Sequence, residues 1–153
     1  MNQDQALIYA KEYLEDLLSF FAVNVIVEAS ISDDVIELDV PATEESRILI
    51  GRGAETLAAF QSTVSAALRN QGIDRPRLNI DIAGYKKQHN EKLAEQAREW
   101  IEGVRKSGDS YIANLNAADR RVVHRVASEY SDISTHSEGE GRDRKIIIAQ
   151  AGS

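Results

Sequence analysis

The spacing of hydrophobic residues in the first half of the chain changes from helical to alternating and back. Apolar residues at every third or fourth position predict an amphipathic helix over residues 3–21. Apolar and polar residues then alternate over 23–29 and 36–40, and the turn residues 32–34 between these runs predict a β-hairpin. The pattern continues with a short helix that Thr43 caps and that runs through 47–49, a helix over 55–69 and a strand over 78–82.

The second half begins with one long helical pattern and ends in short alternating runs. A helix is predicted from Tyr85 to Lys106, with Trp100 at an apolar position and therefore expected in a core. We also predict a helix that begins after Asn116, and strands at 110–115, 132–136 and 145–150. These elements predict a small three-stranded sheet packed on two helices. For the whole chain we expect an α+β fold of two domains, residues 1–84 and 85–153.

A glycine-containing loop separates the predicted helices that end near residue 49 and begin near residue 55. It reads Gly51-Arg52-Gly53-Ala54, and the element order around it resembles a type II KH domain. That resemblance implies that Gly51, Arg52, Gly53 and Ala54 hold the phosphates of a nucleic acid, because such domains place a Gly-x-x-Gly turn there. The chain departs from the pattern at its fourth position, where Ala54 stands instead of glycine. An ordinary turn between two helices is the alternative interpretation.

Arg120 and His124 form the most informative pair in the chain. They are four residues apart in a predicted helix, so both side chains leave the same face. A guanidinium offers a planar fork of donors and an imidazole a further ring nitrogen, which together suit a phosphate. The alternative is a solvated helix surface.

A loop and a strand follow this pair at a characteristic spacing, over residues 134–150. The combination resembles the Arg-x-x-x-His ("R-three-H") domain, a family that binds single-stranded nucleic acid. The resemblance implies that Arg120 and His124 contact phosphate, helped by further residues of the same stretch: Arg121, Ser137, Arg142 and Arg144.

A smaller basic cluster, made of Lys86, Lys87 and His89, opens the long helix. This cluster has two interpretations, a phosphate contact at the junction of the two domains and a solvated helix end.

The two resemblances together cover essentially all 153 residues. Their combination resembles the Jag-type (SpoIIIJ-associated, KhpB-like) family of bacterial RNA-binding proteins. Many members carry an additional amino-terminal domain, which we do not expect here. The resemblance implies a non-catalytic protein that binds single-stranded RNA, with single-stranded DNA as a further possibility.

The distribution of charge qualifies this expectation. The net charge is −7, but residues 1–50 carry −9 while residues 51–153 carry +2. The first half therefore repels a polyanion such as a nucleic acid, whereas residues 51–153 do not. The absence of cysteine excludes disulfides, thiolate zinc sites and thiol catalysis. Without an apolar segment of membrane-spanning length or a signal sequence, we expect a cytoplasmic protein that does not insert into membranes.

Two rival functions come from other classes. His124 and His136 could meet in space, with Asp132 or Glu138 nearby, and suggest a metal-dependent hydrolase. Because no zinc, P-loop or nucleophile-elbow motif accompanies them, we expect no enzyme, no metal and no cofactor. A protein-interaction scaffold that uses the acidic first half is the other alternative.

Few aromatic residues lie near either proposed site, so weak base preference is expected.

Overall fold

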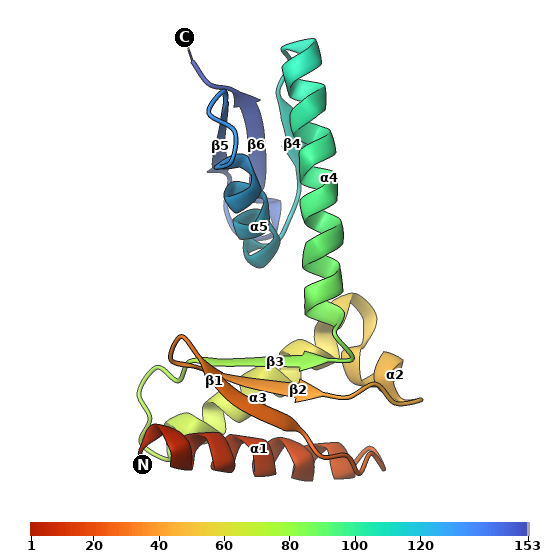
Figure 1. The fold of residues 1–153 in the computed structure, drawn as a ribbon, viewed down its shortest axis with the longest axis vertical. Helices are drawn as coiled ribbons and strands as arrows, with labels where there is room; N and C mark the ends of the chain where they lie inside the picture. The colour runs from red at the N-terminus through yellow and green to blue at the C-terminus, as the bar shows by residue number, and fades with distance from the viewer. Residues whose placement is uncertain (153) are drawn as a thin grey trace. The chain divides into compact units, whose positions relative to one another are not determined.

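The computed structural model describes residues 1–152, in two units: Met1–Lys86, and a second unit that begins at Lys87. Each unit contains one three-stranded sheet and has its own hydrophobic core (Figure 1). The mixed α+β fold predicted from the sequence is therefore confirmed.

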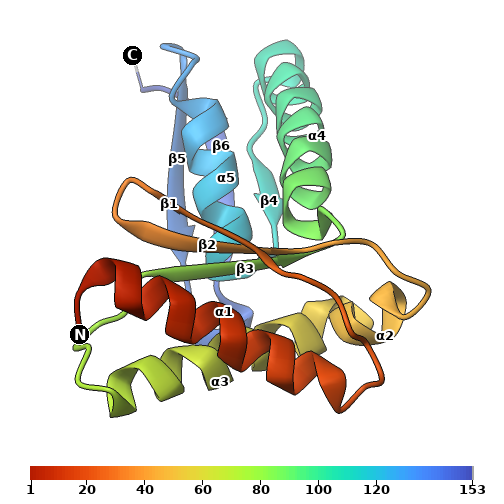
Figure 2. The same cartoon turned by 60° about the horizontal axis from the view of Figure 1, so that its bottom comes forward.

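The first unit has two long helices on one face of its sheet (Figure 2). Its elements are α1 (Gln3–Ser19), β1 (Glu28–Ser32), β2 (Val35–Val40), α2 (Ser46–Ile50), the 3-10 turn η1 (Arg52–Ala54), α3 (Glu55–Asn70) and β3 (Leu78–Ile82). Strand β2 is central, antiparallel to β1 and parallel to β3. The parallel pair requires a crossover connection, and α3 provides it.

The two faces of this sheet differ in polarity. On β2, Ile36, Leu38 and Val40 are buried under the helices, and every residue of α3 that was predicted to face inward is buried: Leu57, Phe60, Val64, Ala67 and Leu68. The intervening positions on β2 and β3 carry polar residues, Glu37, Asp39, Asn79 and Asp81. The face of the sheet opposite α1 and α3 therefore carries acidic side chains, of which Asp81 is buried. Burial and the nearby carboxylates of Asp81, Glu37 and Glu28 raise the pKa of Asp39.

The predicted β-hairpin is present, but its first strand lies later than the predicted 23–29, because β1 begins only at Glu28 and runs to Ser32. Val23 and Val27 are buried as the alternation required, but the Val27 N–H donates to the Glu15 carboxylate of α1 at 2.8 Å instead of to a strand. Burial alone would raise the pKa of Glu15. The Val27 hydrogen bond and the neighbouring Lys11 outweigh burial and lower it.

Two predicted helix ends in the first unit also differ from the structure. Helix α1 ends at Ser19, and Phe21 beyond it is 44% exposed, with its ring centroid 5.6 Å from that of Phe60 in a T-shaped arrangement. Thr43 does not cap α2, which starts at Ser46 with Glu45 as its N-cap and no side-chain cap. The Thr43 hydroxyl instead accepts from the Glu45 N–H in the preceding turn.

The second unit packs two helices on a sheet with the order β4-β6-β5, as the sequence predicted for a three-stranded sheet. Its elements are α4 (Tyr85–Ser107), β4 (Tyr111–Ala113), α5 (Ala117–Ala127), β5 (Ile133–Glu138), the 3-10 turn η2 (Gly141–Asp143) and β6 (Lys145–Gln150). All strand pairs are antiparallel. The core combines Leu93, Ala97, Ile101 and Val104 of α4 with Val123 of α5 and with Ile146 and Ile148 of β6.

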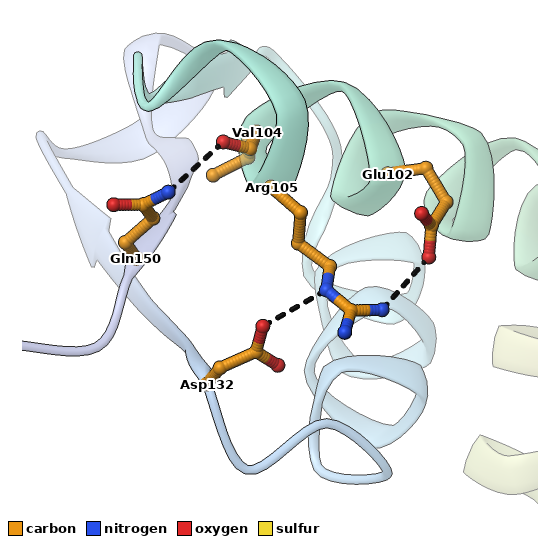
Figure 3. A network of polar contacts seen from close by, with 5 residues as sticks. All are labelled: Glu102, Val104, Arg105, Asp132 and Gln150. Atoms are coloured by element: carbon orange, nitrogen blue, oxygen red, sulfur yellow. Dashed lines mark hydrogen bonds and ion pairs between the residues drawn. The ribbon is translucent and has the colours of Figure 1, made fainter.

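Polar contacts fasten the carboxyl end of α4 to the sheet (Figure 3). Arg105 donates from Nε to Asp132 Oδ2 at 2.8 Å and from Nη1 to Glu102 Oε1 at 3.0 Å. Its guanidinium also lies 5.6 Å from the centre of the Tyr130 ring. Gln150 Nε2 donates to the Val104 carbonyl at 3.4 Å. These contacts hold the carboxyl end of α4 against the start of β5 and the end of β6.

Trp100 is only half-buried, not fully in the core as predicted. Its ring stacks on Tyr111 of β4 with ring centroids 4.8 Å apart and 17° between the planes.

No helix among residues 1–152 is both long and apolar enough to cross a membrane.

Candidate nucleic-acid interface

Helix α5 presents the predicted Arg/His pair. Asn116 caps the helix, since its side chain accepts from the Asp119 N–H at 2.9 Å, and Asp119 lies in the positive first turn. Val122, Val123, Val126 and Ala127 are buried as predicted. Arg121 and Arg125 are exposed, whereas Arg120 and His124 are half-buried where α5 approaches β5. The pair therefore lies at a packed contact between helix and strand rather than on a freely solvated surface.

The His124 ring lies between two hydroxyls of β5. Its Nδ1 is 2.5 Å from Thr135 Oγ1, and its Nε2 is 3.4 Å from Ser137 Oγ. Burial, and then the positive charge of Arg120, lower the pKa of His124. The imidazole is thus neutral at pH 7 and has one donor and one acceptor nitrogen. Because a hydroxyl can donate or accept, Thr135 and Ser137 complement either tautomer.

Arg120 is held by backbone carbonyls rather than by an acid. Its Nη1 donates to the Leu115 carbonyl at 2.5 Å and, more weakly, to the Arg144 carbonyl at 3.5 Å. Among residues 1–152, no carboxylate oxygen lies within 4 Å of its guanidinium. Its charge is therefore oriented but not neutralised, and its remaining N–H donors can serve an anion.

A tight turn between β5 and β6 adds two further arginines. Gly139 has φ +91°, and a Cβ there would come within 2.9 Å of the Asp143 carbonyl oxygen, so only glycine fits. Arg144 donates from Nη1 to the Gly139 carbonyl at 3.1 Å, while Arg142 in η2 is exposed. The turn therefore places the Arg144 backbone beside Arg120.

Two details of this site differ from the sequence analysis. Ser137 was expected in a loop, but β5 continues to Glu138, so Ser137 lies on the strand. Thr135, which makes the shorter contact with His124, was missing from the predicted site. Alternation along the strand would have found it, because residues two apart share a face.

The other histidines have separate partners. His136 and His124 do not meet, since His136 alternates to the other face of β5 and pairs with Glu138 at 3.2 Å. His89 of α4 lies 2.9 Å from Asp119 at the start of α5. No group of three or more His, Cys, Asp or Glu side chains among residues 1–152 is arranged to hold a metal ion.

The glycine loop of the first unit lies at the amino end of α3. Gly51 ends α2 with φ +78°, and a Cβ there would collide with the Thr56 side chain. Arg52 and Gly53 are exposed. Ala54, the residue that departs from Gly-x-x-Gly, has φ +62° and ψ +25°, which is the left-handed region. The loop thus has a glycine-like backbone at a residue that is not glycine.

The first turn of α3 has no side-chain cap beside this loop. The Glu55 N–H donates to the Arg52 carbonyl within the loop itself. Ala54 is its N-cap and has no side chain that could accept from the helix, and no such cap bond forms. The first N–H groups of a helix lack partners within it, and they carry partial positive charge. The exposed Arg52 lies in η1 directly before this helix end. Together these groups could bind an anion.

Lys86 and Lys87, predicted as one basic patch, have different surroundings. Lys86 Nζ donates to Asn79 Oδ1 at 2.7 Å, and burial lowers the pKa of Lys86 although Asp81 and Glu37 oppose the effect. Asp81 also accepts from the Lys86 N–H at 2.9 Å. Lys86 is thus engaged within the first unit, whereas Lys87 is exposed.

Comparison with known proteins agrees with the predicted resemblance. Residues 91–150 match the R-three-H domain. The chain is 27% identical to the RNA-binding protein KhpB of Clostridium symbiosum over 151 residues, which is 96% of this chain and 65% of that protein.

Two further relatives have the same name. Identity to the RNA-binding protein KhpB of Bacillus subtilis (strain 168) is 25% over 143 residues, covering 92% of this chain and 68% of the relative. Identity to the RNA-binding protein KhpB of Streptococcus pneumoniae serotype 2 is 26% over 127 residues, covering 80% of this chain and 38% of the relative. The chain therefore spans about two thirds of the length of the first two relatives. The resemblance to Jag-type proteins is confirmed, and an R-three-H domain lies in the second unit.

Proposed function

We propose that this protein binds single-stranded RNA and catalyses no reaction on it. The observation that carries the proposal is Arg120, a half-buried guanidinium that carbonyls orient and that no carboxylate of the described residues neutralises. It adjoins the neutral His124 with its two hydroxyl partners, a combination of one fixed charge and several donors that suits a phosphodiester. The matching domain family and the RNA-binding relatives support the same function.

We propose a KH-like domain over residues 1–84 as a second, weaker phosphate site, ahead of an R-three-H domain over 85–153. The element order, the loop Gly51–Ala54 and the uncapped start of α3 support this assignment. The acidic face of the first sheet would repel phosphates, so the loop is the favoured contact. The same acidic face is what a protein-interaction scaffold would use, and that function is the alternative.

Replacement of Arg120 tests the proposal. Its side chain also supports the Leu115 and Arg144 carbonyls, so removal of the side chain can disturb the fold as well as binding. Arg120→Lys is the sharper change, because it keeps the charge and removes the planar fork. We expect Arg120→Lys and Arg120→Ala to weaken single-strand binding progressively, by up to about 1–3 kcal/mol for the alanine variant.

Fluorescence anisotropy with single- and double-stranded RNA and DNA measures these affinities, and circular dichroism checks the fold. Lys106→Ala is the matched control, because Lys106 is an exposed cation at the far end of α4. If the folded Arg120 variants bind single-stranded RNA as tightly as the parent, Arg120 does not contact phosphate. If the parent itself binds no nucleic acid at low salt, the scaffold alternative is favoured.

A further inference from the structure

A groove of about 330 Å³ lies between α4 and α5 within the second unit. Its floor includes Val122 and Val126, each 5% exposed, and the half-buried Ala94. Lys87 and Asn90 come from the first turns of α4, and Arg125 comes from α5. None of the phosphate contacts proposed above except Lys87 uses this groove. Its volume is at the lower end of the range for small-ligand sites, about 300–1,000 Å³.

The charges around the groove favour an anionic ligand. Its lining contains three cations, Lys87, Arg98 and Arg125, and two anions, Glu91 and Glu129. Arg98 and Glu129 lie 3.8 Å apart and largely neutralise each other. No carboxylate oxygen within the described residues lies within 4 Å of Lys87 Nζ or the Arg125 guanidinium. Lys87 and Arg125 therefore leave one net positive charge after Glu91 is counted.

The groove and the Arg120/His124 site are joined by the outer face of α5. Arg121 and Arg125 are exposed and follow Arg120 and His124 by one position each. The axial rise from Arg120 to Arg125 is about 7.5 Å at about 1.5 Å per residue. At about 100° per residue, Arg121 and Arg125 lie about 100° and about 140° around the helix axis from Arg120, on its exposed side. A strand whose phosphate lies at Arg120 can therefore pass around this exposed side by way of Arg121 to reach Arg125.

We propose that the α4–α5 groove holds one base of this strand, an inference that rests on the proposed RNA binding. The base lies over Val122 and Val126, and the phosphates beside it contact Lys87 and Arg125. The Asn90 amide has both donors and an acceptor, which are the groups that recognise the edge of an unpaired base. The site therefore gives the protein a modest base preference without an aromatic stacking platform.

A single-abasic scan tests this proposal on the full chain. A fluorescent RNA oligonucleotide is prepared as a series in which one nucleotide at a time lacks its base, and each is titrated with protein. For the parent we expect one position at which loss of the base lowers affinity about fivefold to tenfold, the lower range for one base-edge contact. Asn90→Ala should remove that dependence, and Gln96→Ala, an exposed amide of α4 outside the groove, should keep it.

Charge variants supply the second readout. Lys87→Ala combined with Arg125→Ala should lower affinity about tenfold or more, because two phosphate contacts are lost together. Lys92→Ala, an exposed cation of α4 outside the groove, should have less effect. A flat abasic scan for the parent would overturn the groove assignment. The groove assignment would also be overturned if the groove variants bind RNA as tightly as their control variants while Arg120→Lys binds weakly. In that case the proposed function would stand. A parent that binds no RNA would overturn both.

Discussion

Ala54→Gly is predicted to be neutral or stabilising, although replacing alanine by glycine inside a helix usually weakens a protein. Ala54 is held at φ +62° as the N-cap of α3, a conformation that an L-residue with a Cβ adopts at a cost of about 1–2 kcal/mol. Glycine adopts it without that cost. The change also restores the Gly-x-x-Gly pattern of the loop.

Two opposing contributions set the size of the effect. The greater freedom of glycine in the unfolded chain costs about 0.5–1 kcal/mol. The Ala54 methyl group packs partly against the core of the first unit, and its loss costs a fraction of the ~0.8 kcal/mol of a fully buried methylene. We therefore expect the free energy of unfolding to change by about 0 to +1 kcal/mol.

Urea unfolding of the full chain, followed by circular dichroism, measures this change, with Ala58→Gly as the control. Ala58 is exposed in the interior of α3 with ordinary helical geometry, so glycine there should cost about 1 kcal/mol. The difference between the two variants is then about 1–2 kcal/mol. If both variants lose the same stability, the left-handed backbone of Ala54 carries no strain that glycine can relieve.

Three further predictions concern binding and pH. Arg52→Asp should weaken RNA binding while the helical signal stays, whereas Arg69→Asp, an exposed arginine at the far end of α3, should have little effect. Because the folded protein lowers the pKa of His124 below 6.5, the unfolded chain binds the extra proton first, and stability should fall as pH drops through about 6.5. The free energy of unfolding, measured at about pH 7.5 and about pH 5.5, should differ less for His124→Gln than for the parent. An equal difference in the two proteins would contradict this prediction. The slope of log K against log salt should be roughly −2 to −4, for about three to five phosphate contacts at about −0.7 each. A nearly flat dependence would mean that affinity does not come from phosphates.

Hydrophobic periodicity predicted most of the elements because burial on one face is a local property of the sequence. The inward residues of α3 and the strands β3 and β6 agree with the prediction. The first strand of the hairpin was predicted several residues too early, because alternation indicates extended backbone but not a partner. The partner of the Val27 N–H is Glu15, a side chain twelve positions away, and single-sequence periodicity has no information about such a contact.

The site was predicted in part for the same reason. Spacing alone placed Arg120 and His124 on one face of α5, which the structure shows. It could not show that β5 packs against that face, so the contact of His124 with Thr135 was missed. Nor could it show that the Arg120 guanidinium would be oriented by the Leu115 and Arg144 carbonyls, because these contacts depend on how α5 packs against the sheet.

The structure also shows that Arg120 and His124 contribute differently to the proposed binding. From the sequence, arginine and histidine both count as possible positive charges. In the fold, partial burial and the charge of Arg120 keep His124 neutral at pH 7, so the histidine adds directionality rather than charge. The electrostatic part of binding then rests on the arginines. The slope of log K against log salt should therefore be the same for the parent and a His124→Gln variant. A variant that loses Arg120 should have a slope that is less steep by about 0.7.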